Sequence, residues 1–147
     1  MKVVIQRVRN ASVSVDGKLI NQIDKGFVVL VGFTQEDPSL DIDYIVKKVV
    51  NLRVFDDENG VMNKSILDEG GSILSISQFT LYADTKKGNR PSYIKALNGS
   101  ESIKLYDEFN KKLSQHINVL PGVFGADMQV SLINDGPVTI IIDSKDK

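Results

Sequence analysis

The sequence predicts a mixed α/β fold with a predominantly antiparallel β-sheet and two main helices. The first observation is a set of short strand-like apolar runs that are separated by turn signals. The second is a pair of segments whose apolar residues recur at helical spacing. The third is the order of these elements, βββ-α-βββ-α-βββ, which is typical of a mixed fold whose sheet is mostly antiparallel.

Length and composition indicate one soluble globular domain, residues 1–147. A chain of 147 residues can bury a substantial hydrophobic core. Hydrophobic residues make up 41% and charged residues 25%, which is the ordinary mixture for a globular protein. The formal net charge of −1 argues against a chain whose whole surface binds nucleic acid, although it leaves room for a local basic patch.

The absence of cysteine excludes a thiolate nucleophile, a disulfide framework and a cysteine zinc site. The N-terminal segment has cations at Lys2, Arg7 and Arg9 within an alternating pattern, so it does not resemble a signal peptide. The longest apolar run, residues 27–31, is too short to span a bilayer. We therefore expect a cytoplasmic protein with no membrane segment.

Three strands are predicted at the start of the chain. The alternating pattern of residues 3–13 indicates the first strand, and Asp16-Gly17 is a hairpin signal that leads into a second strand at residues 19–23. Residues 27–31 form a continuous apolar run, which is typical of a strand buried on both faces.

A first helix is predicted after Asp37-Pro38, with Asp37 as the N-cap and Pro38 in the first helical position. One apolar stripe follows at helical spacing and consists of Ile42, Ile45, Val46, Val49 and Leu52. Asn59-Gly60 then predicts a hairpin between residues 53–55 and 61–62.

The segment Ser75–Asp84 reads as a strand that runs out into a polar loop after Gly70-Gly71. On a straight strand, Gln78 and Thr80 share one face, and Ser77 and Phe79 share the other. Composition alone favours a half-buried strand whose polar residues face water.

A loop with three cations, Lys86, Lys87 and Arg90, follows this strand. A second helix is predicted from Ser100 to about His116, and its expected core residues are Ile103, Tyr106, Phe109 and Leu113. Three closing strands are predicted at residues 119–123, 128–133 and 138–142.

Candidates for acid–base or metal chemistry are few. His116 is the only histidine, and its predicted place at a helix C-terminus favours a structural role. Without another histidine, a Ser-His-Asp triad can form only around this residue, and no such arrangement is evident. No cluster has metal-ligand spacing, so neither a metal nor an organic cofactor is expected. The acidic run 56–58 is interpreted as a solvated loop.

The segment Asn134-Asp135-Gly136-Pro137 lies just before an apolar run. Proline donates no backbone N–H and is awkward inside a sheet, so spacing alone favours a simple turn. A turn of this kind is also a plausible place for a cis peptide bond.

Four motifs together resemble one family. They are Ser77-Gln78-Phe79-Thr80, residues 87–92 (KGNRPS), residues 124–128 (FGADM) and residues 134–139 (NDGPVT). With the opening residues 4–8 (VIQRV), they are similar to D-aminoacyl-tRNA deacylases, in the family's order and from Met1 to about Asp143. Tyr93, where phenylalanine is common in the family, is a mild departure.

The resemblance implies a barrel-like core and a homodimer that hydrolyses the ester between a D-amino acid and the 3′-terminal adenosine of tRNA. It implies that Ser77, Gln78, Phe79 and Thr80 of one subunit line the catalytic pocket. The other subunit inserts Gly136 and Pro137, in cis, to read the stereocentre. The remaining implied site residues are Arg7, which helps to fix the Gly-Pro loop, and Phe124, which borders the adenosine.

Two questions stay open at this point, the role of Thr80 and the class of the protein. Thr80 is either a positioning hydroxyl, which we favour because no activating base is evident, or the nucleophile. The chain is either an enzyme in which Lys86, Lys87 and Arg90 contribute to tRNA affinity, or a non-catalytic RNA-binding module. Such a module would use the same cations on phosphates and Phe124 for stacking. A third possibility is a small β-rich ligand-binding or oligomerisation domain with no chemistry.

Overall fold

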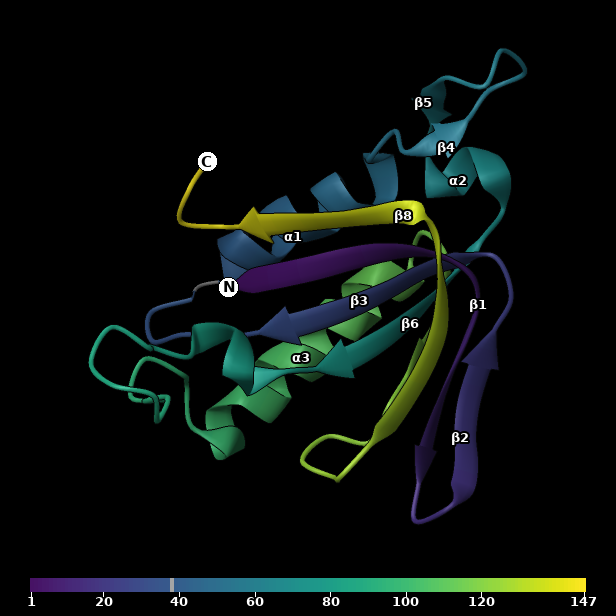
Figure 1. Cartoon of the computed structure of the whole chain (residues 1–147). Helices are drawn as coiled ribbons and strands as arrows, with labels where there is room; N and C mark the ends of the chain where they lie inside the picture. The colour runs from purple at the N-terminus through teal and green to yellow at the C-terminus, as the bar shows by residue number, and fades with distance from the viewer. Residues whose placement is uncertain (38) are drawn as a thin grey trace.

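A six-stranded mixed sheet forms the centre of the computed structural model, which describes residues 1–37 and 39–147 (Figure 1). Its strand order is β2-β1-β3-β6-β7, and β8 pairs with β1. The strands are β1 (Lys2–Val15), β2 (Lys18–Ile23), β3 (Gly26–Gly32), β6 (Ser72–Ser77), β7 (Asn118–Pro121) and β8 (Gln129–Asp143). The three pairings of β1 are antiparallel. The pairings of β6 with β3 and β7 are parallel, because helical crossovers join these strands. The predicted fold class is confirmed.

The two main helices, α1 (Ser39–Asn51) and α3 (Gly99–Ser114), cover one face of the sheet and lie behind it in Figure 1. The larger core lies between these helices and the sheet. Its fully buried members include Phe27, Val29 and Ile73 from the strands, Ile45 and Val49 from α1, and Phe109 and Leu113 from α3. The hairpin of β4 (Phe55–Asp56) and β5 (Met62–Lys64) and the short α2 (Ile66–Glu69) lie at one end of the molecule.

The sheet curls toward its other face into a nearly closed, barrel-like shape, because the long strands β1 and β8 bend together (Figure 1). Their register shifts twice, between Gln6 and Val8 and between Val8 and Ala11. Such irregularities increase the local bend and twist of a sheet. A second apolar cluster fills the inside of the curl and includes Val8, Val13, Val28, Leu74 and Ile76.

The predicted strand from Ser75 to Asp84 is wrong beyond Ser77. β6 ends at Ser77, and Phe79–Tyr82 form the 3₁₀-helix η1. The chain turns where β3, its partner, ends at Gly32. A Cβ atom at Gly32 would lie 2.8 Å from the Gln78 carbonyl oxygen, so the missing side chain lets η1 pack against β3. Gln78 and Thr80 therefore do not share a strand face.

The predicted strands 128–133 and 138–142 are one strand, β8, and the intervening segment is a bulge rather than a terminal turn. Gln6 pairs with Thr139 and Val8 pairs with Asn134, so the four residues between them, 135–138, lie opposite one residue of β1. The Asn134 side chain bridges the bulge by accepting from Val138 N at 3.1 Å and donating to Thr139 Oγ1 at 2.9 Å.

Three details of the predicted helices need comment. Pro38 lies outside the described residues, and the carboxylate of Asp37 accepts from Thr34 N and the amino group of Met1. Ile103 is 39% exposed, so its predicted core position is wrong, and Ser102 is buried on α3 instead. Helix α2 was not predicted, although its capping box of Ser65 and Asp68 is a recognisable sequence signature.

Candidate active site

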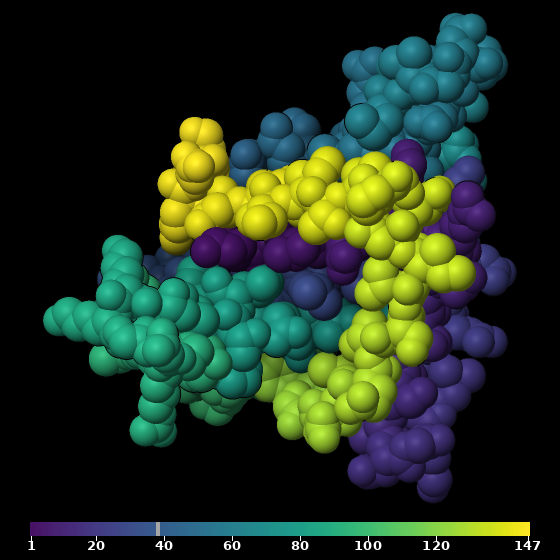
Figure 2. All heavy atoms as spheres, viewed as in Figure 1, coloured from purple at the N-terminus to yellow at the C-terminus, as the bar shows by residue number. Residues whose placement is uncertain are grey.

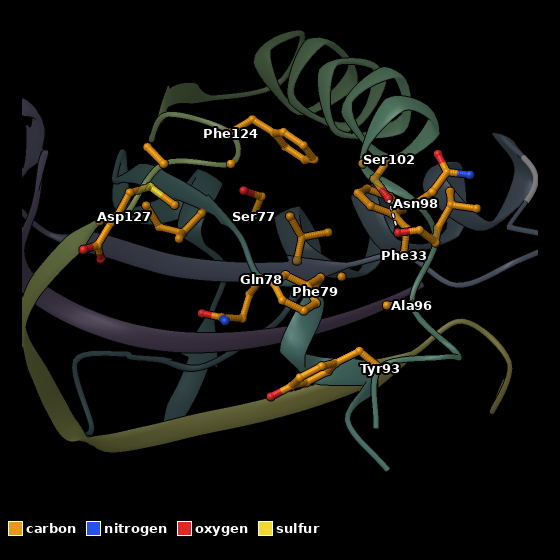
Figure 3. Close-up of a pocket in the computed structure, with 18 of the residues that line it drawn as sticks. Phe33, Ser77, Gln78, Phe79, Tyr93, Ala96, Asn98, Ser102, Phe124 and Asp127 are labelled. Carbon is orange, nitrogen blue, oxygen red and sulfur yellow. Dashed lines mark hydrogen bonds between the residues drawn. The ribbon is translucent and has the colours of Figure 1, made fainter. Parts of the chain in front are cut away.

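A pocket of about 630 Å³ opens where β3 and β6 end (Figure 3). The ends of these two neighbouring parallel strands supply its floor. Its walls come from the start of η1, from residues 96–99 at the beginning of α3, and from the loop before β8. The lining side chains that carry polar groups are Ser77, Gln78, Tyr93, Asn98, Ser102 and Asp127.

The motif at the end of β6 reaches this pocket with three of its four residues. Ser77, Gln78 and Phe79 line the pocket, whereas Thr80 does not. Thr80 is instead held beside it, because Gln78 Nε2 donates a hydrogen bond to Thr80 Oγ1 at 2.5 Å. Thr80 is thus not among the residues that line the pocket of the single chain, and its expected place in the catalytic site stays a prediction.

The backbone of the same segment limits which N–H groups can bind a substrate. Gln78 N–H extends the sheet by donating to the Val31 carbonyl at 2.7 Å, so it is already occupied. Phe79 is the first residue of η1, and the first N–H groups of a helix have no acceptor within that helix. Of the backbone N–H groups of Gln78 and Phe79, that of Phe79 is therefore the better candidate for binding a substrate oxygen.

Two of the polar lining groups are occupied by helix α3. Asn98 Oδ1 accepts from Glu101 N at 3.0 Å and so caps the helix, and Ser102 Oγ donates to the Leu97 carbonyl at 3.1 Å. Among the described residues that line the pocket, Asp127 is the one carboxylate, and Lys, Arg and His are absent. The lining therefore offers no nucleophile paired with a histidine or lysine base.

The predicted adenosine neighbour Phe124 lines the pocket and rests on a buried support. Its ring lies 5.7 Å, centroid to centroid, from the ring of Tyr106 on α3. Tyr106 is 3% exposed, and its hydroxyl donates to the Ser75 carbonyl at 2.7 Å. Burial raises the pKa of Tyr106, although its hydrogen bonds oppose this shift, so the phenol stays protonated and keeps donating.

The Gly-Pro motif lies outside the pocket of its own chain. Gly136 and Pro137 are exposed and contribute nothing to the lining. Their peptide bond is cis. Arg7 is 8% exposed and contacts this bulge through its guanidinium group. Its Nε donates to the Asp135 carbonyl at 3.0 Å, and its Nη1 donates to the Val54 carbonyl at 2.5 Å. Arg7 thus contacts the segment that it was expected to fix.

The three predicted tRNA-binding cations lie on an exposed loop beyond η1. Asp84 and Ser92 close this loop with two backbone hydrogen bonds of 2.8 and 2.9 Å. Lys86, Lys87 and Arg90 are exposed and make no ion pair within the part of the chain that the structure describes. They are not in the pocket, so the structure separates them from the residues expected to do chemistry.

Sequence reasoning gave no role to Tyr93, Asn98, Ser102 or Asp127. Asn98 and Ser102 begin a helix, and N-cap preference was a usable signal for their place at its start. Their convergence with Ser77 depends on packing between distant segments. Among residues 1–37 and 39–147, no three His, Asp or Glu side chains gather as a metal ion would require. No helix of the same residues is long and apolar enough to cross a membrane.

Comparison with known proteins decides the family. A family model described as D-Tyr-tRNA(Tyr) deacylase matches residues 4–143. The chain belongs to this family. The resemblance read from the four motifs is thereby confirmed, and with it the predicted class of enzyme, a D-aminoacyl-tRNA deacylase, which is a hydrolase.

Curated relatives of this family match over the full chain. A D-aminoacyl-tRNA deacylase of Bacteroides fragilis (strain YCH46) is 61% identical over 149 residues, covering 100% of this chain and 99% of the relative. A protein of the same name from Bacteroides thetaiotaomicron (strain VPI-5482) is 57% identical over 149 residues with the same coverage. The similarity to both relatives therefore extends over the full length of this chain.

Two solved structures share the fold. One, titled c-Myc DNA Unwinding Element Binding Protein, has a TM-score of 0.93 and 41% identity, covering 97% of this chain and 98% of that one. The other, titled as a structural analysis of a probable eukaryotic D-amino acid tRNA deacylase, has a TM-score of 0.82 and 17% identity, covering 96% and 97%. At that identity, the second likeness concerns the fold alone.

Proposed function

We propose that this chain hydrolyses the ester that joins a D-amino acid to the 3′-terminal adenosine of tRNA, in the pocket beside η1. Family membership supports the class of reaction. The observation that carries the location is the convergence of Ser77, Gln78, Phe79 and Phe124 on one pocket, although Phe124 lies far from the other three in the sequence. We expect the enzyme to act in the cytoplasm, where aminoacyl-tRNA is used.

The chemistry that we propose is attack by water on an ester that is already activated. The described lining residues hold no paired base and nucleophile, which favours catalysis by positioning and by charge stabilisation. In this scheme Phe124 borders the adenine and Phe79 N–H stabilises the developing oxyanion. Loss of one such donor typically raises the barrier by about 3–4 kcal/mol. Thr80 orients Gln78 and forms no covalent intermediate.

We propose that the active unit is a homodimer in which the Gly136-Pro137 bulge of one subunit enters the pocket of the other. Two observations support this. The bulge is exposed and lies outside its own pocket. In addition, a row of apolar side chains crosses the helix-free face of the sheet toward the pocket. Ile141, Val4, Leu30 and Ile76 form this row, and Ile141 is 66% exposed.

Figure 2 shows this helix-free face, with β8 along one edge and the segment after β6 standing out beside it. A second copy that covered the row would remove its exposed apolar side chains, above all Ile141, from water, which favours association. The same contact would bring a rigid main-chain segment to the pocket.

In this arrangement the enzyme selects D-amino acids by steric exclusion of L-amino acids. A wall of backbone atoms at the α-carbon of the substrate rejects an L side chain by collision and does not depend on which D side chain is present. Glycine has no side chain to collide, so we expect glycyl-tRNA, including glycine mischarged on tRNA(Ala), to be hydrolysed as well.

The test is deacylation of one tRNA that carries the same amino acid in D or L form, or glycine. We expect fast release of the D-amino acid, measurable release of glycine and almost none of the L-amino acid. Equal rates for D and L would contradict selection by exclusion. Binding of tRNA without turnover of any ester would favour the non-catalytic RNA-binding module, and neither binding nor turnover would favour a β-rich domain without chemistry.

A further inference from the structure

We propose that Phe79 and Tyr93 form a stacking site for the base of the nucleotide that precedes the terminal adenosine, so that the protein reads two nucleotides of a single-stranded RNA 3′ end. This inference rests on the proposed function, because it extends the substrate that occupies the pocket. It goes beyond that function by assigning a second base to a second aromatic site.

The first observation is an exposed aromatic pair on the pocket rim. Phe79 and Tyr93 both line the pocket, and their ring centroids are 5.0 Å apart at an interplanar angle of 73°. Phe79 is 56% exposed and Tyr93 is 40% exposed. An edge-to-face pair leaves ring faces uncovered, and an uncovered aromatic face is the feature on which nucleic-acid bases stack.

The second observation is the distance of this pair from the predicted adenosine neighbour. In Figure 3, Phe124 and Tyr93 lie on opposite sides of the pocket, with Ser77 and Gln78 between them. One base against Phe124 therefore leaves the rings of Phe79 and Tyr93 free. The pocket has room for a nucleoside with its aminoacyl ester, and the next base must then lie at the rim.

The third observation is charge. Tyr93 directly follows Ser92, which closes the loop that carries Lys86, Lys87 and Arg90. Asp127, the one carboxylate among the described lining residues, lies on the opposite side of the pocket in Figure 3. A polyanion is attracted to the cationic side and repelled from the acidic side, so the RNA strand leaves the pocket over Tyr93.

The decisive measurement compares D-aminoacyl esters of two dinucleotides that share the terminal adenosine and its phosphate. One carries cytosine in the preceding position and the other has an abasic residue there. For the unmodified protein we expect kcat/KM to be on the order of tenfold higher with cytosine, which is the usual size of one base–aromatic stack. In Tyr93→Ala this ratio should fall to about one, whereas Tyr93→Phe should keep it.

Two matched variants separate stacking from other effects. Ile94→Ser changes a neighbouring residue that is 79% exposed and does not line the pocket, so the ratio should stay at its original value. A variant with Lys86, Lys87 and Arg90 replaced by Gln should bind both dinucleotides more weakly and keep the ratio. Its loss of affinity relative to the unmodified protein should be larger at low salt, because the affected contacts are to phosphate.

The second readout does not depend on turnover. The probe is an oligonucleotide that carries no amino acid and has 2-aminopurine in the position before the terminal adenosine. Its fluorescence should fall when it binds to the unmodified protein or to Tyr93→Phe. It should stay bright with Tyr93→Ala. The chain contains no tryptophan, so the probe signal is easily separated from protein fluorescence.

Three results would overturn the stacking site. One is an equal kcat/KM for the cytosine and abasic esters with the unmodified protein. Another is a bright 2-aminopurine probe in the bound complex. The third is a Tyr93→Ala variant that sediments as a monomer while the unmodified protein is a dimer, which would make Tyr93 a subunit contact. Failure to hydrolyse any ester, with the probe quenched, would instead contradict the proposed function and leave the stacking site supported.

Discussion

Two motif segments of this chain, residues 77–80 at the end of β6 and residues 134–139 within β8, have opposite surroundings. The first turns inward from β6 and places Ser77, Gln78 and Phe79 in the pocket. The second bulges outward from β8 and presents Gly136 and Pro137 to solvent, held by a buried arginine. The first segment lines the pocket of its own chain, and the second lies outside that pocket, as its proposed insertion into a partner's pocket requires. Substitutions in each segment test this comparison.

The largest effect on catalysis is expected from Gly136→Ala. The residue has φ +130°, and an added Cβ would lie 2.8 Å from Val138 Cγ2 and 3.1 Å from Arg7 Nη2. The bulge must shift, and a misplacement of about 1 Å can reduce a rate about 100-fold. We expect a loss of this size in kcat/KM for D-aminoacyl-tRNA, in an enzyme that remains folded by circular dichroism.

The matched control is Gly17→Ala, at the hairpin between β1 and β2. This glycine also has positive φ, +75°, but nothing lies within 4 Å of the added methyl group. It should cost stability through backbone strain and leave the rate close to its original value. Equal rates for the two variants would show that the bulge of β8 takes no part in the reaction.

A smaller effect is expected from Arg7→Ala. This variant removes the contacts that hold the bulge of β8 but leaves the sequence of the bulge unchanged. The variant leaves the Asp135 and Val54 carbonyls without their donor. We expect the free energy of unfolding, measured with urea, to fall by about 3 kcal/mol, because hydrogen bonds from a buried charged group are lost. Deacylation should fall on the order of tenfold through loss of positioning.

Arg9→Ala is the control for this variant. Arg9 Nε lies 3.5 Å from the carboxylate of the same Asp135, but its side chain is 73% exposed. An exposed ion pair contributes little, so its stability should stay within about 0.5 kcal/mol of the original. If Arg7→Ala lost stability and kept full activity, the position of the bulge would be irrelevant to turnover.

The smallest effect is expected from Thr80→Val in the inward segment. Thr80 lies outside the pocket and accepts one hydrogen bond from Gln78. Removing one neutral hydrogen bond costs about 1 kcal/mol, so kcat should fall about fivefold. Thr80→Ser keeps the hydroxyl and should keep the rate. A loss of about a thousandfold in Thr80→Val, or a trapped aminoacyl ester on Thr80, would make this residue the nucleophile after all.

Much of the scaffold was predictable because it depends on neighbours in sequence. Asp16 and Gly17 both adopt positive φ in the predicted hairpin, and the apolar run 27–31 of β3 is buried except for the half-buried Leu30. The stripe of α1 points into the core, as its spacing predicts. The family, too, was readable from four short motifs, because each motif is a local string of residues.

The site was predictable only in part. Ser77, Gln78, Phe79 and Phe124 line one pocket, and Thr80 lies beside it. Their expected roles in the reaction stay predictions. Tyr93 and Asp127 also line this pocket, although no role was predicted for them. The expected roles of Arg7, Gly136 and Pro137 remain predictions until the substitutions above are made. The single-domain organisation of residues 1–147 also stays a prediction.

The sequence by itself determined the hairpin between β1 and β2, the two main helices, most of the strands and the family to which the chain belongs. Those properties follow from the dihedral preferences and side-chain periodicity of a few consecutive residues. The tertiary structure alone decided that β6 ends at Ser77, because Gly32 on the neighbouring strand makes room for η1. It also decided that residues 134–137 bulge within β8 and do not end it, because Arg7 and the pairing with β1 hold both sides of the segment. These outcomes depend on contacts between distant residues, whose free energies no local pattern encodes.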